Sequence, residues 1–397
     1  MFQIFSENLR IPFMAIKWLM AVISVAAIVF SIFMLSTKGL NYGVDFAGGA
    51  QMVLKFNESV NVDEEALRKA VSEIGLIQAS VQRFGTDFEA ATKEYIVHFS
   101  GDFANEEVVQ KKISEALLES GAPAALVHFR FSGMEKAYLS LTESLPADEI
   151  EKILRSIKFD LLQIDGVSAF GNSVAKEYEL RFGSVADMVS IALNKKFKTE
   201  AVPTALTIEK LDFVGAKVGG DLKTSAVLSV LITLALIFLY VFLRFDFAFA
   251  PGVVIALAHD VIITAGLFSL FQFEFDLTTV AALLAVAGYS VNDTIIVFDR
   301  IREMIAEYKG KDLAAIIDLA INQTLNRTVI TSGTTLAATL ILWIYGGAVI
   351  HGFAFALTAG IFVGTYSSIF VASTLLLGFH KWQDRNQKDS KHRVAAA

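Results

Sequence analysis

Six apolar runs, each long enough to cross a lipid bilayer, constrain this chain more than any other feature. A membrane-spanning helix needs about 20 mostly apolar residues, because each residue adds only about 1.5 Å of length. The runs lie at residues 18–35, 226–243, 251–270, 278–298, 328–345 and 352–377. We therefore expect a multi-pass α-helical membrane protein with six transmembrane helices, the last five of them in the segment 226–377.

The chain must also hold a sizeable water-soluble part. Of its 397 residues, 54% are hydrophobic and 19% are charged, a mixture too apolar for a soluble protein and too charged for a purely intramembrane one. The net charge of -7 gives no reason to expect nucleic acid as a partner. The sequence has no cysteine and its histidines are scattered, so we expect neither a metal site nor a cofactor.

Lys and Arg predict the orientation, because cytoplasmic connections are enriched in them. Basic residues flank the cytoplasmic side of every run in this interpretation, whereas the links 271–277 and 345–352 contain none. We expect the termini, residues 1–17 and 378–397, in the cytoplasm of a bacterial cell, and residues 38–223 outside its inner membrane. No small-residue cleavage site closely follows the first run, which favours an uncleaved anchor over a signal peptide.

The long segment between the first two runs alternates strand-like and helix-like stretches. Up to about residue 133 the order is β-α-β-β-α-β, that of a ferredoxin-like domain, and the pattern then recurs. We expect a large extracytoplasmic α+β domain of two ferredoxin-like units, tandem or interleaved, at about 41–133 and 134–223. Nothing in them resembles a catalytic triad or a phosphate loop. The domain either binds polypeptide or serves as a spacer between membrane contacts.

Two carboxylates lie inside apolar runs, where a charge costs roughly 2.5–3.5 kcal/mol. Asp260 lies near the middle of the third run, next to His259, and Asp293 lies about 7–8 Å inside the cytoplasmic end of the fourth. Arg327 stands where the fifth run begins on the same side. We expect Asp293 and Arg327 at similar depth, where they could pair.

Polar side chains accompany these charges. Asn292 precedes Asp293, and the fifth run carries a hydroxyl-rich face formed by Thr328, Thr331 and Thr335. Carboxylates, an arginine and hydroxyls in one bundle are the components of a proton relay. The alternative is a static buried ion pair that fixes helix packing, with the hydroxyls bonded to their own helix backbone.

Glycines in the sixth run indicate close helix packing. Gly360 and Gly364 form a G-x-x-x-G step, which lets a neighbouring helix approach. Ordinary glycine richness of membrane helices is the alternative explanation.

Several motifs resemble those of the SecD/SecF family of protein-export membrane proteins, within the resistance-nodulation-division (RND) superfamily. "NYGVDFAGG" (41–49) is similar to the family's G-x-D-F-x-G-G motif, and "FVGAKVGGDL" (213–222) to its V-G-P-x-x-G-x-E-L motif. In the second motif Ala216 replaces the usual Pro and Asp221 the usual Glu. Further matches in family order are "ALAHDVIIT" (256–264), the stretch 273–303, "LNRTVITSGTTL" (325–336) and "GTYSSIFVAS" (364–373).

The resemblance implies half of a twelve-helix RND-type bundle, completed by SecD. The pair would act beside the SecYEG channel and the SecA motor, and would use the proton gradient to promote export of unfolded polypeptide, without enzymatic activity. It implies relay roles for Asp293 and Arg327, with Asp260 secondary. The glycine motifs would join the external domain firmly to the membrane helices. Their residues are Gly43, Asp45, Gly48, Gly49, Gly215 and Gly219.

The chain departs from the family pattern in one respect, because typical members carry one ferredoxin-like external domain. We expect the extra material at about 125–202, and the resemblance gives it no role. Two other functions stay open: a half-size RND-type exporter of small molecules or lipids, and a purely structural stabiliser of the translocon. Aspartate and hydroxyl groups suit H⁺ or Na⁺ equally as the coupled ion.

Overall fold

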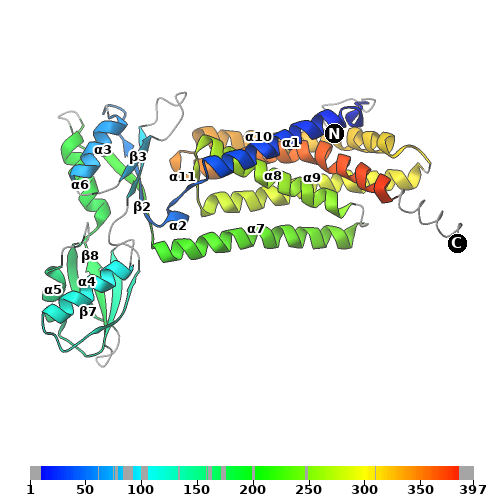
Figure 1. The fold of residues 1–397 in the computed structure, drawn as a ribbon. Helices are drawn as coiled ribbons and strands as arrows, with labels where there is room; N and C mark the ends of the chain where they lie inside the picture. The colour runs from blue at the N-terminus through cyan, green and yellow to red at the C-terminus, as the bar shows by residue number, and fades with distance from the viewer. Residues whose placement is uncertain are drawn as a thin grey trace. The chain divides into compact units, whose positions relative to one another are not determined.

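The computed structural model describes residues 10–383 except for a set of short gaps. The gaps are 61, 75, 77–78, 84–92, 100–105, 133–134, 158, 160–162, 171–175, 199–201, 246–248 and 309. Parts of the two expected cytoplasmic ends, 1–9 and 384–397, therefore lie outside the described residues. The chain divides into a helical unit, Met1–Asn41 with Ser225–Ala397, and an α+β unit, Tyr42–Thr224 (Figure 1).

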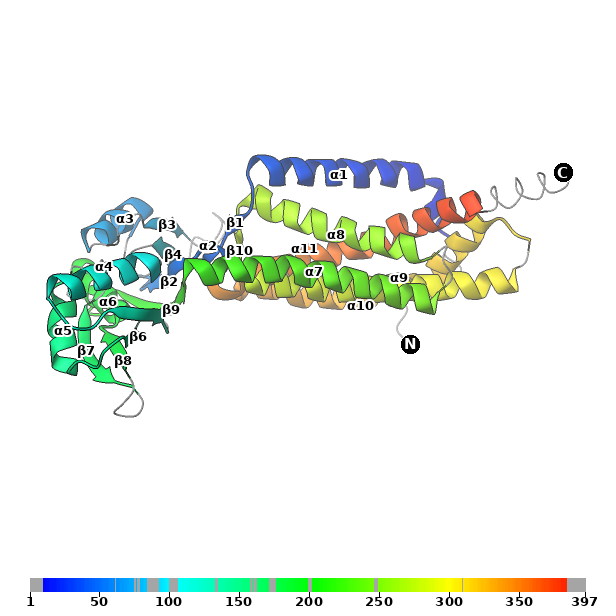
Figure 2. The same ribbon diagram turned by 60° about the horizontal axis from the view of Figure 1, so that its bottom comes forward.

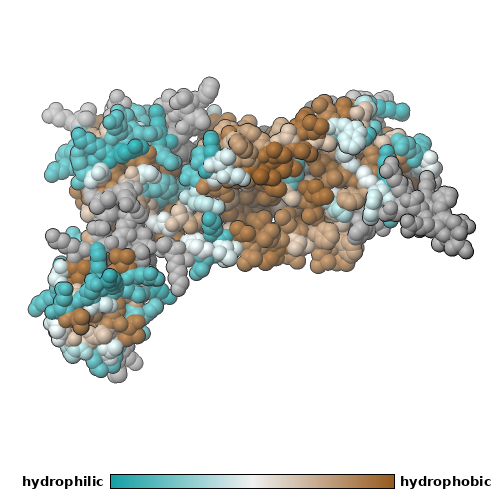
Figure 3. Space-filling model, in the orientation of Figure 1, coloured by the Kyte–Doolittle hydropathy of each residue, from teal (hydrophilic) through white to brown (hydrophobic). Residues whose placement is uncertain are grey.

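Six helices of the described chain are long and apolar enough to cross a membrane, which confirms the expected number. They are α1 (Lys17–Thr37), α7 (Ala216–Arg244), α8 (Ala250–Phe271), α9 (Leu277–Glu307), α10 (Leu313–Tyr345) and α11 (Ala348–Ser367). The last continues through a π-helical turn, Ser368–Ala372, and further helix to residue 383. Figure 2 shows the helices running side by side, and Figure 3 shows their hydrophobic outer surface.

α9 and α10 are among the helices that extend well beyond the apolar runs that predicted them. α9 continues past residue 298 to Glu307, and α10 begins at Leu313, well before residue 328. The extensions are amphipathic, with Met304 and Ile317 buried and charged residues such as Arg302 exposed. Hydropathy marks the part of a helix that lipid can surround, whereas the helix itself ends where its caps lie.

The segment that precedes α1 is tied to α10. The side chain of Asn322 accepts a hydrogen bond from the Ile11 amide and donates one to the Ile11 carbonyl, both at 2.9 Å. Asp318 accepts the amide of Met14 at 2.7 Å, in the short helix η1 (Phe13–Ala15). These bonds satisfy backbone groups at the start of α1 and fix its position against α10.

α11 is the central helix of the bundle and packs against α8, α9 and α10. A Cβ atom at Gly360 would lie 2.5 Å from the side chain of Val286, and one at Gly364 would lie 3.0 Å from Cβ of Ser290. α11 and α9 therefore touch at a distance that only glycine permits. The G-x-x-x-G prediction of close packing is confirmed.

The α+β unit is built from short helices and strands. They are α2 (Val44–Ala47), β2 (Gly49–Phe56), α3 (Glu64–Glu73), β3 (Ser80–Arg83), β4 (Glu94–Phe99), α4 (Glu106–Glu119), β5 (Leu126–Phe131), β6 (Lys136–Leu141), α5 (Ala147–Arg155), β7 (Ile164–Ala169), β8 (Glu177–Phe182), α6 (Val185–Phe197) and β9 (Leu206–Val214). Two further strands have two residues each. They are β1 (Asn41–Tyr42), at the boundary between the units, and β10 (Glu274–Phe275), in the helical unit. Strands β2 to β9 form two antiparallel sheets, β3-β4-β2-β9 and β5-β6-β8-β7.

Each sheet is completed by the helix and strand that sequence order alone would assign to the other sheet. β9 pairs with β2, from Gly49↔Val214 to Phe56↔Leu206, and α6 packs on β9. β5 pairs instead with β6, and α4 packs on β5. The units are interleaved, so the predicted bounds 41–133 and 134–223 are wrong. Element order alone cannot say which helix and strand complete which sheet, because either exchange buries the same apolar faces.

An internal repeat underlies the exchange. β4 reads "EYIVHF" and β8 reads "EYELRF", and each is the third strand of its β-α-β-β stretch. The Tyr95 hydroxyl donates to the Val62 carbonyl at 2.5 Å, and the Tyr178 hydroxyl donates to the Leu145 carbonyl at 2.7 Å. Both carbonyls lie just before the first helix of their stretch. The same bond thus holds the same turn in both sheets.

Candidate functional site

Asp293 lies inside the bundle on α9, with 2% of its surface exposed. Its Oδ2 accepts a hydrogen bond from the hydroxyl of Ser332 on α10, at 3.0 Å. Within the described chain, Asp293 and Arg327 form no ion pair within 4.0 Å. The expected direct pairing is therefore not present in this structure, and a hydroxyl of α10 takes its place.

The other predicted relay residues surround this contact without touching Asp293. Arg327 and Asn292 are exposed on α10 and α9. The hydroxyls of Thr331 and Thr335 donate to carbonyls one turn earlier in their own helix, at 2.9 Å each, as the alternative interpretation proposed. Thr328 is buried, and its hydroxyl has no hydrogen-bond partner among the described residues.

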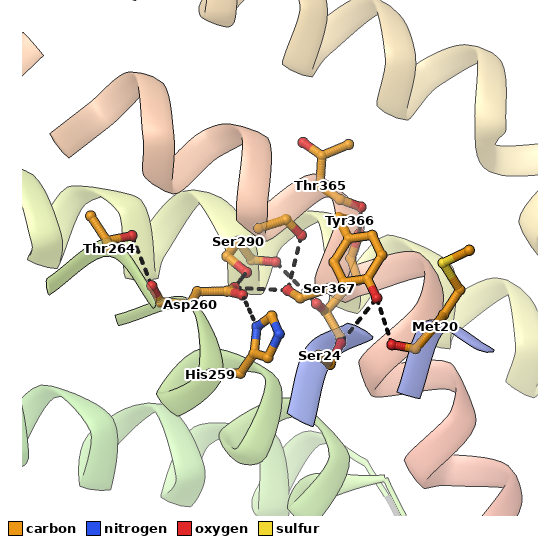
Figure 4. A network of polar contacts seen from close by, with 12 residues as sticks. Met20, Ser24, His259, Asp260, Thr264, Ser290, Thr365, Tyr366 and Ser367 are labelled. Carbon is orange, nitrogen blue, oxygen red and sulfur yellow. Dashed lines mark hydrogen bonds and ion pairs between the residues drawn. The ribbon is translucent and has the colours of Figure 1, made fainter. Parts of the chain in front are cut away.

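Asp260 is fully buried on α8 and forms the centre of a second polar network (Figure 4). Its Oδ2 accepts from Ser290 of α9 at 2.6 Å and from Ser367 of α11 at 2.8 Å. Its Oδ1 lies 2.9 Å from Nδ1 of His259. One carboxylate thereby joins three helices.

The network reaches α1 through Tyr366. The Tyr366 ring stacks on the His259 ring, with centroids 6.2 Å apart. Its hydroxyl donates to the Met20 carbonyl at 2.8 Å and lies 3.0 Å from the Ser24 hydroxyl. Figure 4 shows Tyr366 and Ser24 beside the cluster formed by His259 and Asp260.

The α9 partner of Asp260 and the second carboxylate, Asp293, share one face of α9. Ser290, which bonds Asp260, and Asp293 are three residues apart on α9 and both are buried. In the described structure no Lys or Arg lies within 4.0 Å of either carboxylate. Since a buried polar group without a partner is costly, the hydroxyls of Ser290, Ser332 and Ser367 help to satisfy these carboxyl groups inside the apolar bundle.

Ser332 lies beside the hydroxyl-rich face predicted for the fifth run, but the sequence did not identify Ser290, Ser367 or Tyr366 as site residues. Ser290, Ser332, Ser367 and Tyr366 lie in apolar helices, where a hydroxyl commonly bonds its own backbone. The available signal was position, because Ser290 precedes Asp293 by three residues and so shares its buried face.

The glycines of the first junction motif shape the start of the α+β unit. Gly43 precedes α2, whose first turn contains Asp45, and two glycines with positive φ follow. Gly48 has φ +73° and Gly49 has φ +110°, backbone conformations that residues with a Cβ rarely adopt. They turn the chain from α2 directly into β2.

The second junction motif contacts the first. A Cβ atom at Gly219, near the start of α7, would lie 3.2 Å from the Gly48 nitrogen and from the Phe46 carbonyl. Gly215 has open space where a Cβ would point. The start of α7 therefore packs directly on the backbone of the first motif, so the structure brings the two motifs together.

Comparison with known proteins identifies the family. Residues 194–382 match the family model of the protein export membrane protein SecD/SecF C-terminal region, and residues 33–60 match that of the SecD/SecF GG motif. The protein translocase subunit SecF of Vibrio alginolyticus is 37% identical over 377 residues, which are 95% of this chain and 92% of that protein. The chain belongs to the SecF family.

Solved structures agree with membership of the SecF family. A crystal structure of SecDF, a translocon-associated membrane protein from Thermus thermophilus, is 28% identical with a TM-score of 0.61. The match covers 95% of this chain and 40% of the SecDF chain. The SecF of Rhodothermus marinus is 50% identical over 196 residues, 48% of this chain. The resemblance and the fold class, a six-helix membrane protein with a ferredoxin-like α+β part, are thus confirmed.

Proposed function

We propose that this chain works with a SecD partner to promote export of polypeptides across the bacterial cytoplasmic membrane, driven by the proton gradient. The observation that carries the proposal is the buried Asp293, bonded to Ser332 inside a helix of membrane-spanning length. A carboxylate at such a position is most useful if it gains and loses a proton, because each change alters the charge inside an apolar bundle. The coupled ion in this proposal is H⁺.

The partner would cover the face of α9 and α10 that carries Asn292 and Arg327. Both side chains are exposed in the chain alone, and an arginine facing lipid is costly. The solved SecDF chain is longer, since this chain spans 40% of it. A SecD half-bundle on this face would enclose Arg327 near Asp293 and complete the relay.

Protonation would reach the rest of the chain through existing contacts. α10 carries Ser332 and is bonded to the segment before α1 through Asn322 and Ile11. α1 leads into the glycine motif 43–49, against which the start of α7 packs. We propose that the α+β unit lies on the external side and contacts the emerging unfolded polypeptide. SecYEG would lie alongside in the membrane lipid, and SecA would act through that channel, with no nucleic acid involved.

The test is export of a secretory protein by energised vesicles that carry Asp293→Asn with the SecD partner. Export should lose its dependence on the proton gradient while assembly stays at the wild-type level. The matched control is Asp299→Asn, because Asp299 is exposed on the same helix and lies 3.5 Å from Arg244. Gradient-dependent export at the normal rate in Asp293→Asn would assign Asp293 a structural role. Selective collapse of the H⁺ or the Na⁺ gradient identifies the ion.

A further inference from the structure

His259 is a buried ionisable group that the proposed relay leaves unused. It is 2% exposed on α8, at the centre of the network in Figure 4. Its Nδ1 lies 2.9 Å from Oδ1 of Asp260. Its Nε2 is buried and has no hydrogen-bond partner among the described residues.

The partners of Asp260 indicate where the protons lie. Ser290 and Ser367 both approach Oδ2 at donor distance, so that oxygen acts as an acceptor. Where Asp260 is ionised, the bond at Oδ1 is made by an Nδ1–H of His259, because a carboxylate has no proton to give. A neutral imidazole carries one N–H, which leaves Nε2 as a bare acceptor. In this state the pair holds one net negative charge inside the bundle.

We propose that His259 and Asp260 form a second proton-binding site, distinct from Asp293. A proton from the acidic side of the membrane binds the lone pair of Nε2, forming one N–H bond and breaking none within the pair. The pair passes from net charge −1 to a neutral imidazolium–carboxylate pair, and release of the proton reverses the step. This inference rests on the proposed function, because the gradient supplies the proton.

The groups around the pair are hydroxyls and an aromatic ring. The groups that face the pair are Ser290 from α9, Ser367 and Tyr366 from α11, and Ser24 through Tyr366 from α1. Within the described residues no cation competes with an imidazolium, and the Tyr366 ring stacks on it. The nearest further titratable group on α9 is Asp293, one turn from Ser290.

Tyr366 is the positioning residue that would carry this change to α1. Its ring touches His259, and its hydroxyl donates to the Met20 carbonyl of α1. A charge that appears on the imidazole strengthens the ring contact, and the ring is bonded to α1. Tyr366→Phe keeps the ring and removes that bond, so it should leave proton binding intact and weaken its effect on export.

The direct test is nitrogen NMR of ¹⁵N-histidine-labelled full-length chain, assembled with its SecD partner in lipid. The sequence has six histidines, and His259→Asn assigns the signal by removing it. We expect an imidazole with Nδ1–H and a bare Nε2 at the high-pH end of a pH series, and a doubly protonated ring at its low-pH end. An Nε2–H tautomer, or no second proton over that range, would overturn the proposal.

The functional arm compares His259→Asn with wild type in the vesicle assay. The Asn amide reproduces the donor at Nδ1 and keeps the Asp260 bond, but it cannot take up a proton. The gradient-stimulated part of export should be lost, with assembly and gradient-independent export retained; unchanged stimulation counts against the site.

The outcomes separate the two proposals. If His259 binds a proton and Asp293→Asn still exports in a gradient-dependent way, this site is kept and the Asp293 relay is refuted. If His259 binds no proton and export by Asp293→Asn no longer depends on the gradient, the Asp293 relay is kept and this site is refuted.

Discussion

Two buried tyrosines stabilise equivalent turns of the α+β unit. Among the described residues, the Tyr95 hydroxyl is the only side chain that donates a hydrogen bond to the Val62 carbonyl. Tyr95→Phe removes this bond and should lower the free energy of unfolding by about 1–3 kcal/mol. Tyr178→Phe should cost at least as much, because that hydroxyl also accepts the Leu145 amide at 2.8 Å. Urea unfolding of segment 42–224, which has its own hydrophobic core, measures both by circular dichroism.

Tyr138→Phe is the control for this pair. Its partly exposed ring packs on Phe170, and its change should stay within about 0.5 kcal/mol. If all three variants change the free energy of unfolding equally, the two buried hydroxyls contribute no more to stability than the partly exposed hydroxyl of Tyr138.

Substitution by Ala should have opposite effects on stability at Gly219 and at Gly220. Ala in place of Gly inside a helix normally stabilises it by about 0.5–1 kcal/mol, and a Cβ at Gly220 meets open space. At Gly219 the Cβ would press on backbone atoms of Phe46 and Gly48, so Gly219→Ala should destabilise segment 42–224. Thermal unfolding of the two variants compares them. A stabilising Gly219→Ala would mean that α7 does not need this contact.

His98 should make the α+β unit less stable in mild acid. Burial lowers the pKa of His98 below its ordinary value of 6.5, so the unfolded chain binds the proton more tightly than the folded one. The free energy of unfolding should therefore be constant above about pH 7 and fall as the pH drops below 6.5 toward the folded pKa. Urea unfolding of segment 42–224 between pH 8 and 5 measures the slope.

His98→Gln should flatten that slope, with the exposed His128→Gln as control for loss of an imidazole. Lys196 lowers the pKa of Glu73 below 4.5, and Arg181 does the same for Glu179. Protonation of these two glutamates therefore reduces the free energy of unfolding only below that pH. A slope that persists in His98→Gln between pH 6.5 and 5 would exclude His98 as its source.

The sequence identified the costly groups of the site but not their partners. Asp260 and Asp293 are conspicuous because a carboxylate in an apolar run carries a large free-energy cost. A serine in such a run carries almost no free-energy cost. Nothing in the local sequence of Ser290 or Ser332 therefore distinguishes a hydroxyl that bonds a carboxylate from one that bonds its own helix. Arg327 was predicted at the depth of Asp293, yet the direction of its side chain depends on which face of α10 is covered.

At the scale of elements, lipid makes helices predictable, whereas sheets depend on pairing. An apolar run must form a helix in the bilayer to satisfy its backbone, so the six spans follow from hydropathy alone. The strands were located, but β5 and β9 are interchangeable by pattern. Each is an edge strand that follows a helix and can complete a β-α-β-β stretch.

Excision of one sheet tests the exchange of β5 and β9. A chain that lacks residues 100–183, with β4 joined to α6 by a short linker, keeps β3-β4-β2-β9 and both of its helices. It should remain folded and protease-resistant, with one ferredoxin-like domain. A chain that lacks 134–214 instead removes β9 from β2 and β6 from β5, and should be degraded.

The second excision is the control that decides between the two arrangements. If the chain lacking 134–214 resists protease and the chain lacking 100–183 does not, the units are sequential and the exchange is refuted.

At the scale of the whole molecule, the proposed coupling needs the two units on defined sides of the membrane. The distribution of basic residues predicts that the α9–α10 connection lies in the cytoplasm and the α+β unit outside. Since the chain has no cysteine, one introduced thiol reports its side without interference. Ser168 on β7 and Glu307 at the end of α9 are both exposed and suit this test.

In intact spheroplasts, a membrane-impermeant maleimide should label Ser168→Cys and leave Glu307→Cys unlabelled until the membrane is permeabilised. The reason is that the positive residues beside Glu307, including Arg300 and Arg302, resist translocation, whereas five of the six helices follow the α+β unit and return the chain to the cytoplasm. Full labelling of both sites after permeabilisation controls for reactivity. The reverse pattern would place the α+β unit in the cytoplasm, where it could not contact an emerging polypeptide, and the proposed export function would fail with it.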